Sequence, residues 1–252
     1  MRRMLVVATL LAFTPGSGAD AANPVRDVLW VALQGCVLAK KAAGRSFPCL
    51  SVDLGDATRP GTAVLRAPGH PTHTVVMPTD SVSGIEAPVL QGPRGAAYWR
   101  AALDARHFVS DVLQGRLPVA AVGLEVNSVG GRSQDQLHIH LDCMRRGVMA
   151  ALKAQDPAVG ERWAPFPVPL EEDRYLAVRV PADAVATFNP FAALAGVPGW
   201  QGNLHDASFA AVSADPDDPA AGMIVLAYRM PDASAEELMD HTCRMARPGR
   251  GM

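Results

Sequence analysis

A strictly alternating segment, residues 136–143, follows a glycine-rich turn in the middle of the chain. Side chains of a β-strand point alternately to its two faces, so the segment predicts a strand with one apolar and one polar face. The apolar face would carry Leu137, Ile139 and Leu141, and the polar face would carry Gln136, His138, His140 and Asp142. This strand must therefore lie in a sheet that buries one side in a hydrophobic core.

A second predicted strand, residues 120–127, precedes the turn Ser128–Ser133, and the two strands are expected to form a hairpin. Other apolar runs predict strands at 63–65, 74–77, 174–180, 208–213 and 222–230. Apolar residues at helical spacing predict helices at 95–114 and 145–155 and a short helix at 189–196. The proline-rich residues 156–169 are expected to form a surface linker.

The ends of two helices are marked by capping residues. Asn23 and Pro24 suit the start of the first helix, and Gly44 suits its end. A final helix is expected to begin at Ser234, because Glu237 three residues later completes a capping box.

These elements predict an α+β fold with an antiparallel sheet and flanking helices. Residues 209–228 take the same place in the second half as residues 122–140 take in the first, but they carry no histidine. We therefore expect two similar halves, residues 22–155 and residues 156–252, packed as one globular unit. At 252 residues and 49% hydrophobic, the chain can bury such a core.

The N-terminus has the pattern of a secretory signal. Arg2 and Arg3 precede the short apolar run 4–13, and Ala19-Asp20-Ala21 offers a cleavage site. Residues 1–21 are thus expected to be a signal peptide or a retained membrane tether. The predicted location is the periplasm or the periplasmic face of the bacterial inner membrane.

Export gives the four cysteines a role, because disulfides form in oxidising compartments. Three pairings can be drawn. We favour Cys36–Cys49 with Cys143–Cys243, since the first pair closes a short local loop. A zinc site is disfavoured, because no two cysteines have C-x-x-C spacing. The net charge of −2 offers no basic surface for nucleic acid.

The polar face of the 136–143 strand is the predicted site of chemistry. Neutral imidazole is a nucleophile near neutral pH, and a neighbouring polar group can fix which ring nitrogen attacks. A metal site built from His138, His140 and Asp142 is the alternative, because H-x-H on a strand also suits metal binding. The other histidines lack a supporting pattern and are assigned structural or surface roles: His70, His73, His107, His205 and His241.

The stretch from Asn127 to His140 resembles the histidine triad superfamily, whose members show an asparagine, a glycine-rich turn, a serine and alternating histidines. The matching residues are Asn127, Gly130, Gly131, Ser133, Gln136, His138 and His140. Residues 73–79 resemble the superfamily's H-x-L-V-I-P-K strand, with Thr79 where lysine is common. The resemblance implies an HIT-like fold.

A longer series of motifs resembles the bacterial CDP-diacylglycerol pyrophosphatase family. These motifs are Asn23-Pro24, Leu29-Trp30, Pro48-Cys49, Met77-Pro78-Thr79, Ser83-Gly84-Ile85-Glu86, Tyr98, Ala105-Arg106, Asn127-Ser128, Gly131-Arg132-Ser133-Gln134 and Leu137-His138-Ile139-His140. The resemblance implies hydrolysis of CDP-diacylglycerol to CMP and phosphatidate at the membrane surface, without metal or other cofactor. The alternatives are a broader nucleoside-diphosphate pyrophosphatase and a non-catalytic nucleotide- or metal-binding envelope protein.

The superfamily's nucleophile is the middle member of the triad. Counting from Ser133 makes Gln136 the first member, His138 the nucleophile and His140 a supporting residue. The frame His138–His140–Asp142 would instead make His140 the nucleophile. The expected phosphate or nucleotide contacts are Asn127, Arg132, Ser133 and Gln136, with the amides of the turn.

Overall fold

The computed structural model describes residues 26–200 and 202–246. The predicted signal 1–21 and the predicted cap of Asn23 and Pro24 lie outside the described residues. Among the described residues, no helix has the length and apolar character needed to span a bilayer.

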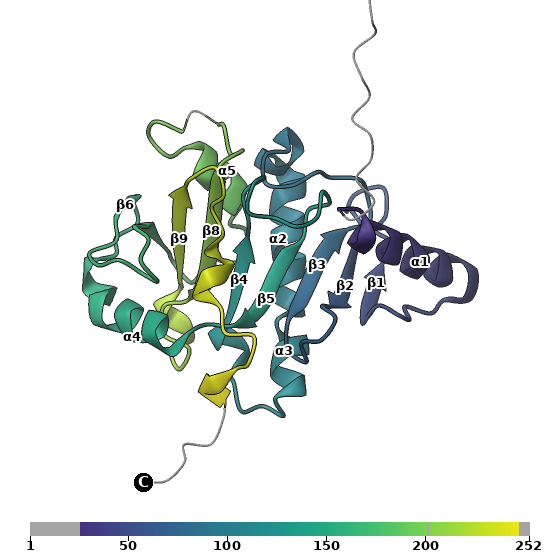
Figure 1. Ribbon diagram of the computed structural model, residues 1–252, viewed down its shortest axis with the longest axis horizontal. Helices are drawn as coiled ribbons and strands as arrows, with labels where there is room; N and C mark the ends of the chain where they lie inside the picture. Colours follow the sequence, from purple (N-terminus) through teal and green to yellow (C-terminus); the bar gives the residue numbers. More distant parts are fainter. Residues whose placement is uncertain (1–25, 201, 247–252) are drawn as a thin grey trace, which may run out of the picture.

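One antiparallel sheet runs through the molecule (Figure 1). Its strand order within the described residues is β1-β2-β3-β5-β4-β8-β9-β7-β6. The strands are β1 (Ser51–Asp53), β2 (Thr62–Arg66), β3 (Thr74–Pro78), β4 (Val122–Val126), β5 (Ile139–Cys143), β6 (Ala164–Pro165), β7 (Leu176–Val180), β8 (Ala207–Ser213) and β9 (Met223–Arg229). From the β4–β8 pair outward, one side reads β4, β5, β3, β2 and the other reads β8, β9, β7, β6. The hairpins β4–β5 and β8–β9 thus lie back to back at the centre.

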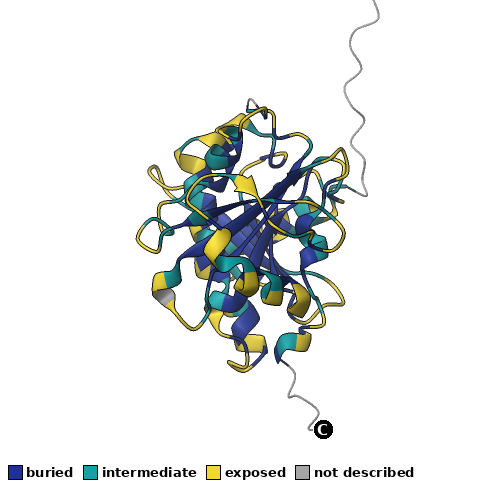
Figure 2. Cartoon of the chain, turned by 90° about the vertical axis from the view of Figure 1, so that its left-hand side faces the viewer, coloured by how far each residue is buried: buried dark blue, intermediate teal, exposed yellow. Residues whose placement is uncertain are grey.

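Five α-helices cover the sheet unevenly within the described part of the chain. They are α1 (Val28–Ala43), α2 (Pro93–Ala105), α3 (His107–Val112), α4 (Arg146–Gln155) and α5 (Pro190–Ala195). Helices α2, α3 and α5 pack on one face in a core that includes Leu137, Ile139 and Leu141. The burial pattern confirms the predicted apolar face of this segment, and Figure 2 shows the sheet as the buried centre of the molecule.

The other face carries α1 at one end and α4 at the other, with a gap between them. Helix α1 packs on β1–β3 and α4 on the β7–β9 end. His140 lies opposite Val75 of β3, which belongs to the core under α1. On its other side it lies opposite Glu125 of β4, and the next residue across the sheet, Ala210 of β8, belongs to the core under α4. The polar face of β5 therefore lies in the gap, and the C-terminal stretch 231–246, yellow in Figure 1, crosses it.

Several predicted elements have different bounds in the structure. Strand β5 begins at Ile139 rather than at residue 136, because Leu137 N donates to Val82 O outside the sheet. The predicted helix 95–114 is broken into α2 and α3 at Arg106, whose guanidinium donates to Leu103 O in the last turn of α2. Residues 156–169 are not only linker, because they contain β6. Strand β1 was not predicted.

Residues 234–246 do not form the predicted final helix, and within this described segment the only helices are the short 3-10 helices Ala235–Leu238 and Arg244–Ala246. The capping box does not form, because Glu237 accepts a hydrogen bond from Tyr175 Oη at 2.7 Å instead of turning back to Ser234. The short helix α5, by contrast, lies within the predicted residues 189–196, and Asn189 caps it by accepting from the amides of Phe191 and Ala192.

Both favoured disulfides are confirmed. Cys36–Cys49 ties the loop after α1 back onto the helix, and Cys143–Cys243 ties the C-terminal stretch to the end of β5. No free cysteine remains among the described residues. Two disulfides fit a protein that is exported to an oxidising compartment.

Candidate active site

His138 is held in one tautomer by the backbone. Its Nδ1 lies 2.6 Å from the carbonyl oxygen of Gln136. A carbonyl oxygen only accepts hydrogen bonds, so Nδ1 must carry the proton and Nε2 must carry the lone pair. Burial lowers the pKa of His138, which keeps the ring neutral at pH 7. His138 thus presents a neutral nitrogen with a fixed direction.

A small hollow lies beside His138. It is lined by Gly84, Ile85, Val126, Asn127, Arg132, Leu137 and His138. Asn127 donates from Nδ2 to Glu236 at 3.1 Å, while its Oδ1 is buried and lacks a hydrogen-bond partner among the described residues. An unpaired buried amide oxygen is costly, so it is a natural contact for a bound polar group.

His140 is the centre of a row of imidazoles. Its Nδ1 lies 2.7 Å from His73 Nε2, and its ring centroid lies 4.7 Å from that of His138. His73 in turn stacks on His241 with the ring centroids 4.1 Å apart. Burial lowers the pKa of His140 well below its ordinary value and lowers that of His73 to about 4. His140 can therefore help by hydrogen bonding but carries no positive charge at neutral pH.

His73 and His241, which were expected to have structural or surface roles, lie in the same cluster as His140. His73 immediately precedes β3 and is buried against His140, and His241 reaches the same cluster from the C-terminal stretch. The pairing of β3 with β5 brings His73 to His140, and this pairing was not predicted from the sequence. The resemblance of residues 73–79 to a family strand was the available signal.

Glu236 and His241 bind the C-terminal stretch to the histidine cluster. His241 contacts Asp142 through Nδ1 at 2.8 Å and Glu236 through Nε2 at 3.2 Å. These two carboxylates raise the pKa of His241 to about 9, so the ring is protonated at neutral pH. Neither Glu236 nor its role was predicted, because it lies more than a hundred residues after Asn127.

The raised pKa of His241 predicts a pH-dependent stability. Its folded-state pKa of about 9 exceeds the ordinary value of 6.5, so its contribution is complete below pH 6.5 and is lost as the pH rises through 9. We expect the free energy of unfolding of the wild type to fall over this window relative to that of His241→Asn. Urea titrations of both proteins from pH 6 to pH 9.5 measure it, and parallel curves would contradict the assignment.

Glu125 is an uncompensated carboxyl group beneath the cluster. It is fully buried on β4, and its Oε2 lies 3.8 Å from His140 Nε2. Neither atom has a hydrogen-bond partner among the described residues. Burial, with the nearby Glu236, raises the pKa of Glu125 well above its ordinary value, which favours the protonated, neutral form of this carboxyl group.

Of the predicted substrate contacts, Gln136 and Arg132 have hydrogen-bond or ion-pair partners within the protein. Gln136 uses its amide to hold the neighbouring loop, donating to Pro78 O and Asp80 O and accepting from Val82 N. Arg132 is buried rather than exposed and pairs with Glu86 and Asp135. Ser133 is exposed and lies outside the lining of the hollow.

The turn that was expected to offer amides to phosphate has few to offer. The amides of Ser128, Val129, Gly131 and Arg132 already donate within the protein. Gly130 and Gly131 are needed for close packing, because a Cβ at either would lie 2.1 or 2.3 Å from a carbonyl oxygen of residues 231–233. The glycines of this turn thus seat the C-terminal stretch.

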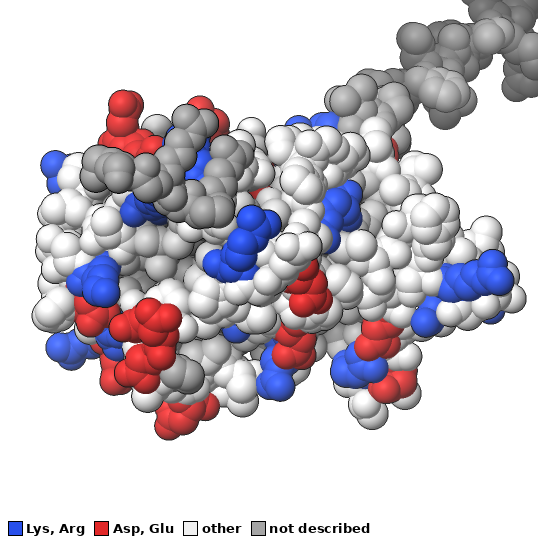
Figure 3. Space-filling model, turned by 90° about the horizontal axis from the view of Figure 1, so that it is seen from below, with Lys and Arg blue, Asp and Glu red and all other residues white. Residues whose placement is uncertain are grey.

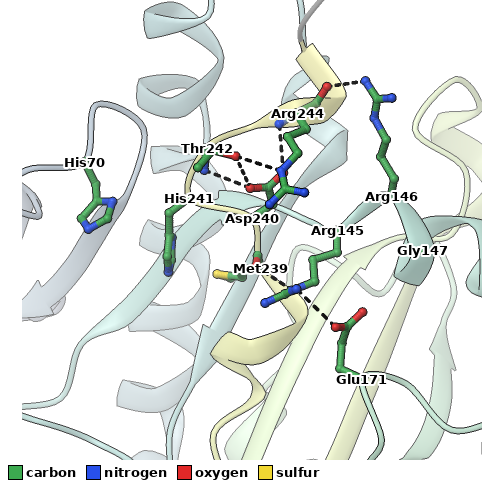
Figure 4. Close-up of a pocket in the computed structure, with 10 residues that line it drawn as sticks. All are labelled: His70, Arg145, Arg146, Gly147, Glu171, Met239, Asp240, His241, Thr242 and Arg244. Carbon is green, nitrogen blue, oxygen red and sulfur yellow. Dashed lines mark hydrogen bonds and ion pairs between the residues drawn. The ribbon is translucent and has the colours of Figure 1, made fainter.

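A cavity of about 480 Å³ opens at the far end of the imidazole row (Figure 4). His241 and His70 form one part of its wall, and Arg145, Arg146 and Arg244 form another. Arg145 pairs with Glu171 at 3.3 Å, and Arg146 donates to the carbonyl oxygen of Arg244. The cavity gives solvent a route to His241.

Apart from Asp142 with the disulfide-bonded Cys143 and Cys243, two groups of described residues have side chains close enough to share a metal ion. They are His73, Glu236 and His241, and Glu125, His140 and Glu236, each with ligand atoms within 4.8 Å of one another. The alternative set of His138, His140 and Asp142 is not one of these groups, because Asp142 binds His241 and the amide of Cys143.

The site combines a buried neutral imidazole of fixed tautomer, a hollow beside it, and adjacent histidines and carboxyl groups. This combination is typical of an enzyme active site. The comparisons with known proteins agree. The family model described as CDP-diacylglycerol pyrophosphatase matches residues 24–247. A probable CDP-diacylglycerol pyrophosphatase of Mycobacterium leprae is 30% identical over 98% of this chain and 96% of its own length. The CDP-diacylglycerol pyrophosphatase of Yersinia pestis is 31% identical over 87% of this chain and 84% of its own length.

The chain therefore belongs to the CDP-diacylglycerol pyrophosphatase family. Membership makes it a hydrolase, as the sequence motifs predicted.

Proposed function

We propose that the protein hydrolyses the pyrophosphate bond of CDP-diacylglycerol to CMP and phosphatidate, with His138 as the nucleophile. Family membership supports the substrate. The observation that best supports His138 as the nucleophile is the hydrogen bond from its Nδ1 to Gln136 O, because this bond leaves Nε2 with a lone pair that can attack phosphorus. His140 is the weaker candidate, since its Nδ1 is engaged with His73 and its Nε2 faces Glu125.

The reaction then has two displacements. Nε2 of His138 attacks the phosphorus that bears the cytidine, an N–P bond forms, and the bridging P–O bond breaks to release phosphatidate. Water next attacks the same phosphorus, the N–P bond breaks, and CMP leaves with one oxygen from water. The electron pair of the broken N–P bond returns to Nε2, so the ring is neutral again, and the proton lost from water passes to solvent. Positioning and charge neutralisation dominate such transfers.

Three neighbours are suited to support these steps. The unpaired Oδ1 of Asn127 and the unpaired Nε2 of His140 are buried polar atoms beside His138. Arg132 lines the same hollow, but Glu86 and Asp135 compensate its charge. We therefore assign Asn127 and His140 to hydrogen bonding with the substrate, and Arg132 to positioning of the loop before His138.

We also propose that the fold is HIT-like and arose by duplication, with residues 22–155 and 156–252 as its halves. The mirrored strand order on either side of the β4–β8 pair supports this proposal. Ala210 and Leu226 of the second half occupy the places that Glu125 and His140 occupy in the first half. Ala210 and Leu226 pack in the apolar core under α4, whereas Glu125 and His140 lie between α1 and α4. The second half would then have kept the sheet and lost the chemistry.

The proposed location is the periplasm or the periplasmic face of the inner membrane. The two disulfides support an oxidising compartment, and the N-terminal pattern 1–21 supports export. The lipid nature of the substrate supports a position at the membrane surface.

The direct test is release of CMP. Purified protein is incubated with CDP-diacylglycerol and, separately, with soluble nucleoside-diphosphate compounds, and CMP and phosphatidate are quantified. We expect turnover of the lipid substrate with equal amounts of both products. Faster turnover of soluble compounds would favour the broader pyrophosphatase, and binding without product would favour the non-catalytic alternative.

Activity is expected to survive exhaustive treatment with a chelator, because a histidine nucleophile needs no Lewis acid. CMP release is measured with the chelator present and again after the chelator has been removed. Loss of activity that one divalent ion restores would place a metal in one of the two carboxylate–histidine groups around Glu236.

A further inference from the structure

The outer face of α1 carries an apolar stripe that the described residues leave uncovered. Val28, Val31 and Leu38 keep 58%, 67% and 68% of their surface exposed. They recur at helical spacing with the exposed residues Gly35 and Ala42. The opposite face of α1 packs on β1–β3, so the helix is apolar on both sides. A continuous exposed apolar surface of this kind marks an interaction site.

The loop after α1 adds an aromatic side chain at the same end of the molecule. Phe47 is 81% exposed. The disulfide between Cys36 and Cys49 fastens this loop to the middle of α1. The stripe and Phe47 are thus parts of one braced unit, which is the arrangement expected of a rigid docking surface.

Positive charge accompanies the stripe. Between Val28 and Leu50 the chain has the cations Lys40, Lys41 and Arg45 and no Asp or Glu. Lys40 and Lys41 lie in the last turn of α1, and Figure 3 shows Lys and Arg side chains gathered at the end of the molecule where α1 ends. Apolar side chains with adjacent cations complement a bilayer that contains anionic lipids.

The start of the same helix contacts the loop that leads to His138. The amide of Leu29 donates to Gln134 Oε1 at 3.0 Å, and Arg26 pairs with Asp135 at 2.7 Å. Anything that holds the α1 stripe also holds the loop 133–138. The docking surface and the candidate nucleophile are therefore mechanically linked.

We propose that the α1 stripe, with Lys40 and Lys41, docks the enzyme on an anionic lipid bilayer. The stripe enters the headgroup region, and the loop before His138 is brought to the depth of the lipid-linked diphosphate. This inference rests on the proposed function for the identity of the substrate. A second copy of the chain is the competing occupant, but in a parallel pair of α1 helices the lysines at the end of the stripe would face like charges, whereas an anionic bilayer attracts them.

The test compares matched charge substitutions in the full chain. Val31→Asp with Leu38→Asp alters the stripe, and Val112→Asp with Val119→Asp alters two exposed residues on elements that pack over the other face of the sheet. Flotation with phosphatidylcholine vesicles, with and without phosphatidylglycerol, measures binding. We expect the stripe variant to bind at least about tenfold more weakly and the control to bind like the wild type. Lys40→Gln with Lys41→Gln should weaken binding about tenfold only when phosphatidylglycerol is present.

Activity separates docking from folding and from the proposed chemistry. The stripe variant should lose turnover of vesicle-embedded CDP-diacylglycerol but retain turnover of a short-chain, water-soluble analogue. Equal flotation of the stripe variant and the wild type would overturn the docking proposal. This includes the case in which residues 1–25 alone hold both proteins on vesicles. A wild-type dimer that the stripe variant dissociates in sedimentation equilibrium would overturn it in favour of a second copy. Absence of CMP from both substrates with the wild type would overturn the proposed function alone, since flotation does not depend on turnover.

Discussion

Replacement of His138 by alanine is expected to lower CMP release by roughly 10⁴-fold or more, the loss typical of a removed nucleophile. The fold should persist, because among the described residues the one hydrogen bond of the side chain is local and goes to Gln136 O, two residues earlier. CMP release under saturating substrate measures the effect, and the unfolding transition in urea checks the fold.

The matched control is His140→Asn, which removes the neighbouring imidazole but keeps a polar side chain. We expect a smaller loss of about 100-fold, because His140 assists through hydrogen bonding and not through a covalent bond. If His140→Asn were inactive and His138→Ala active, the frame His138–His140–Asp142 would be correct and His140 would be the nucleophile.

The covalent step itself can be trapped in the wild type. Rapid quenching without acid after mixing with cytidine-labelled substrate should leave label on the protein, since an N–P bond is stable to base and labile to acid. The His138→Ala protein should hold no label. Substrate chiral at phosphorus gives a second readout, because two displacements retain the configuration, whereas direct attack by water inverts it.

Removal of the Cys143–Cys243 disulfide is expected to have the largest effect on stability. The bridge spans a sequence separation of 100, and the loop-closure model assigns about 4.7 kcal/mol to a loop of that length. Cys143→Ser with Cys243→Ser should lower the free energy of unfolding by about this amount. It should also lower activity, because Glu236 and His241 lie on the stretch that this bridge fastens to β5.

The control is Cys36→Ser with Cys49→Ser. This bridge spans a separation of 13, and the same model assigns it about 3 kcal/mol. It lies at α1, away from the histidine cluster, so turnover of a soluble substrate should be little affected. Equal losses of activity in the two double variants would show that the C-terminal bridge has no particular connection with the site.

Local patterns in the sequence were enough to predict much of the sheet. Alternation predicted the two faces around β5, and apolar runs located strands such as β3, β8 and β9 to within a residue or two. Predictions failed where a tertiary contact overrides a local signal. Glu237 could have capped a helix at Ser234, but the Tyr175 hydroxyl binds it instead.

The candidate site was predictable only where it is contiguous in sequence. His138, His140 and Asn127 are close in the chain, and the structure gathers them as expected. His73 and Glu236 come from segments far away in the chain. Residues 73–79 resemble a family strand, but no local pattern shows that β3 and the C-terminal stretch both lie beside β5. The pairing of Arg132 with Glu86 was not predictable from its own neighbourhood either, because Glu86 lies 46 residues earlier.

The attachment of the C-terminal stretch over β5 has a consequence for timing. Glu236 and His241 are among the last described residues to leave the ribosome, and Cys143 cannot bond to Cys243 until both thiols meet an oxidant. A chain whose synthesis has not reached these residues therefore has His138 and Asp142 but lacks Glu236 and His241. A complete chain whose Cys143 and Cys243 stay reduced would lack the bridge that holds this stretch in place.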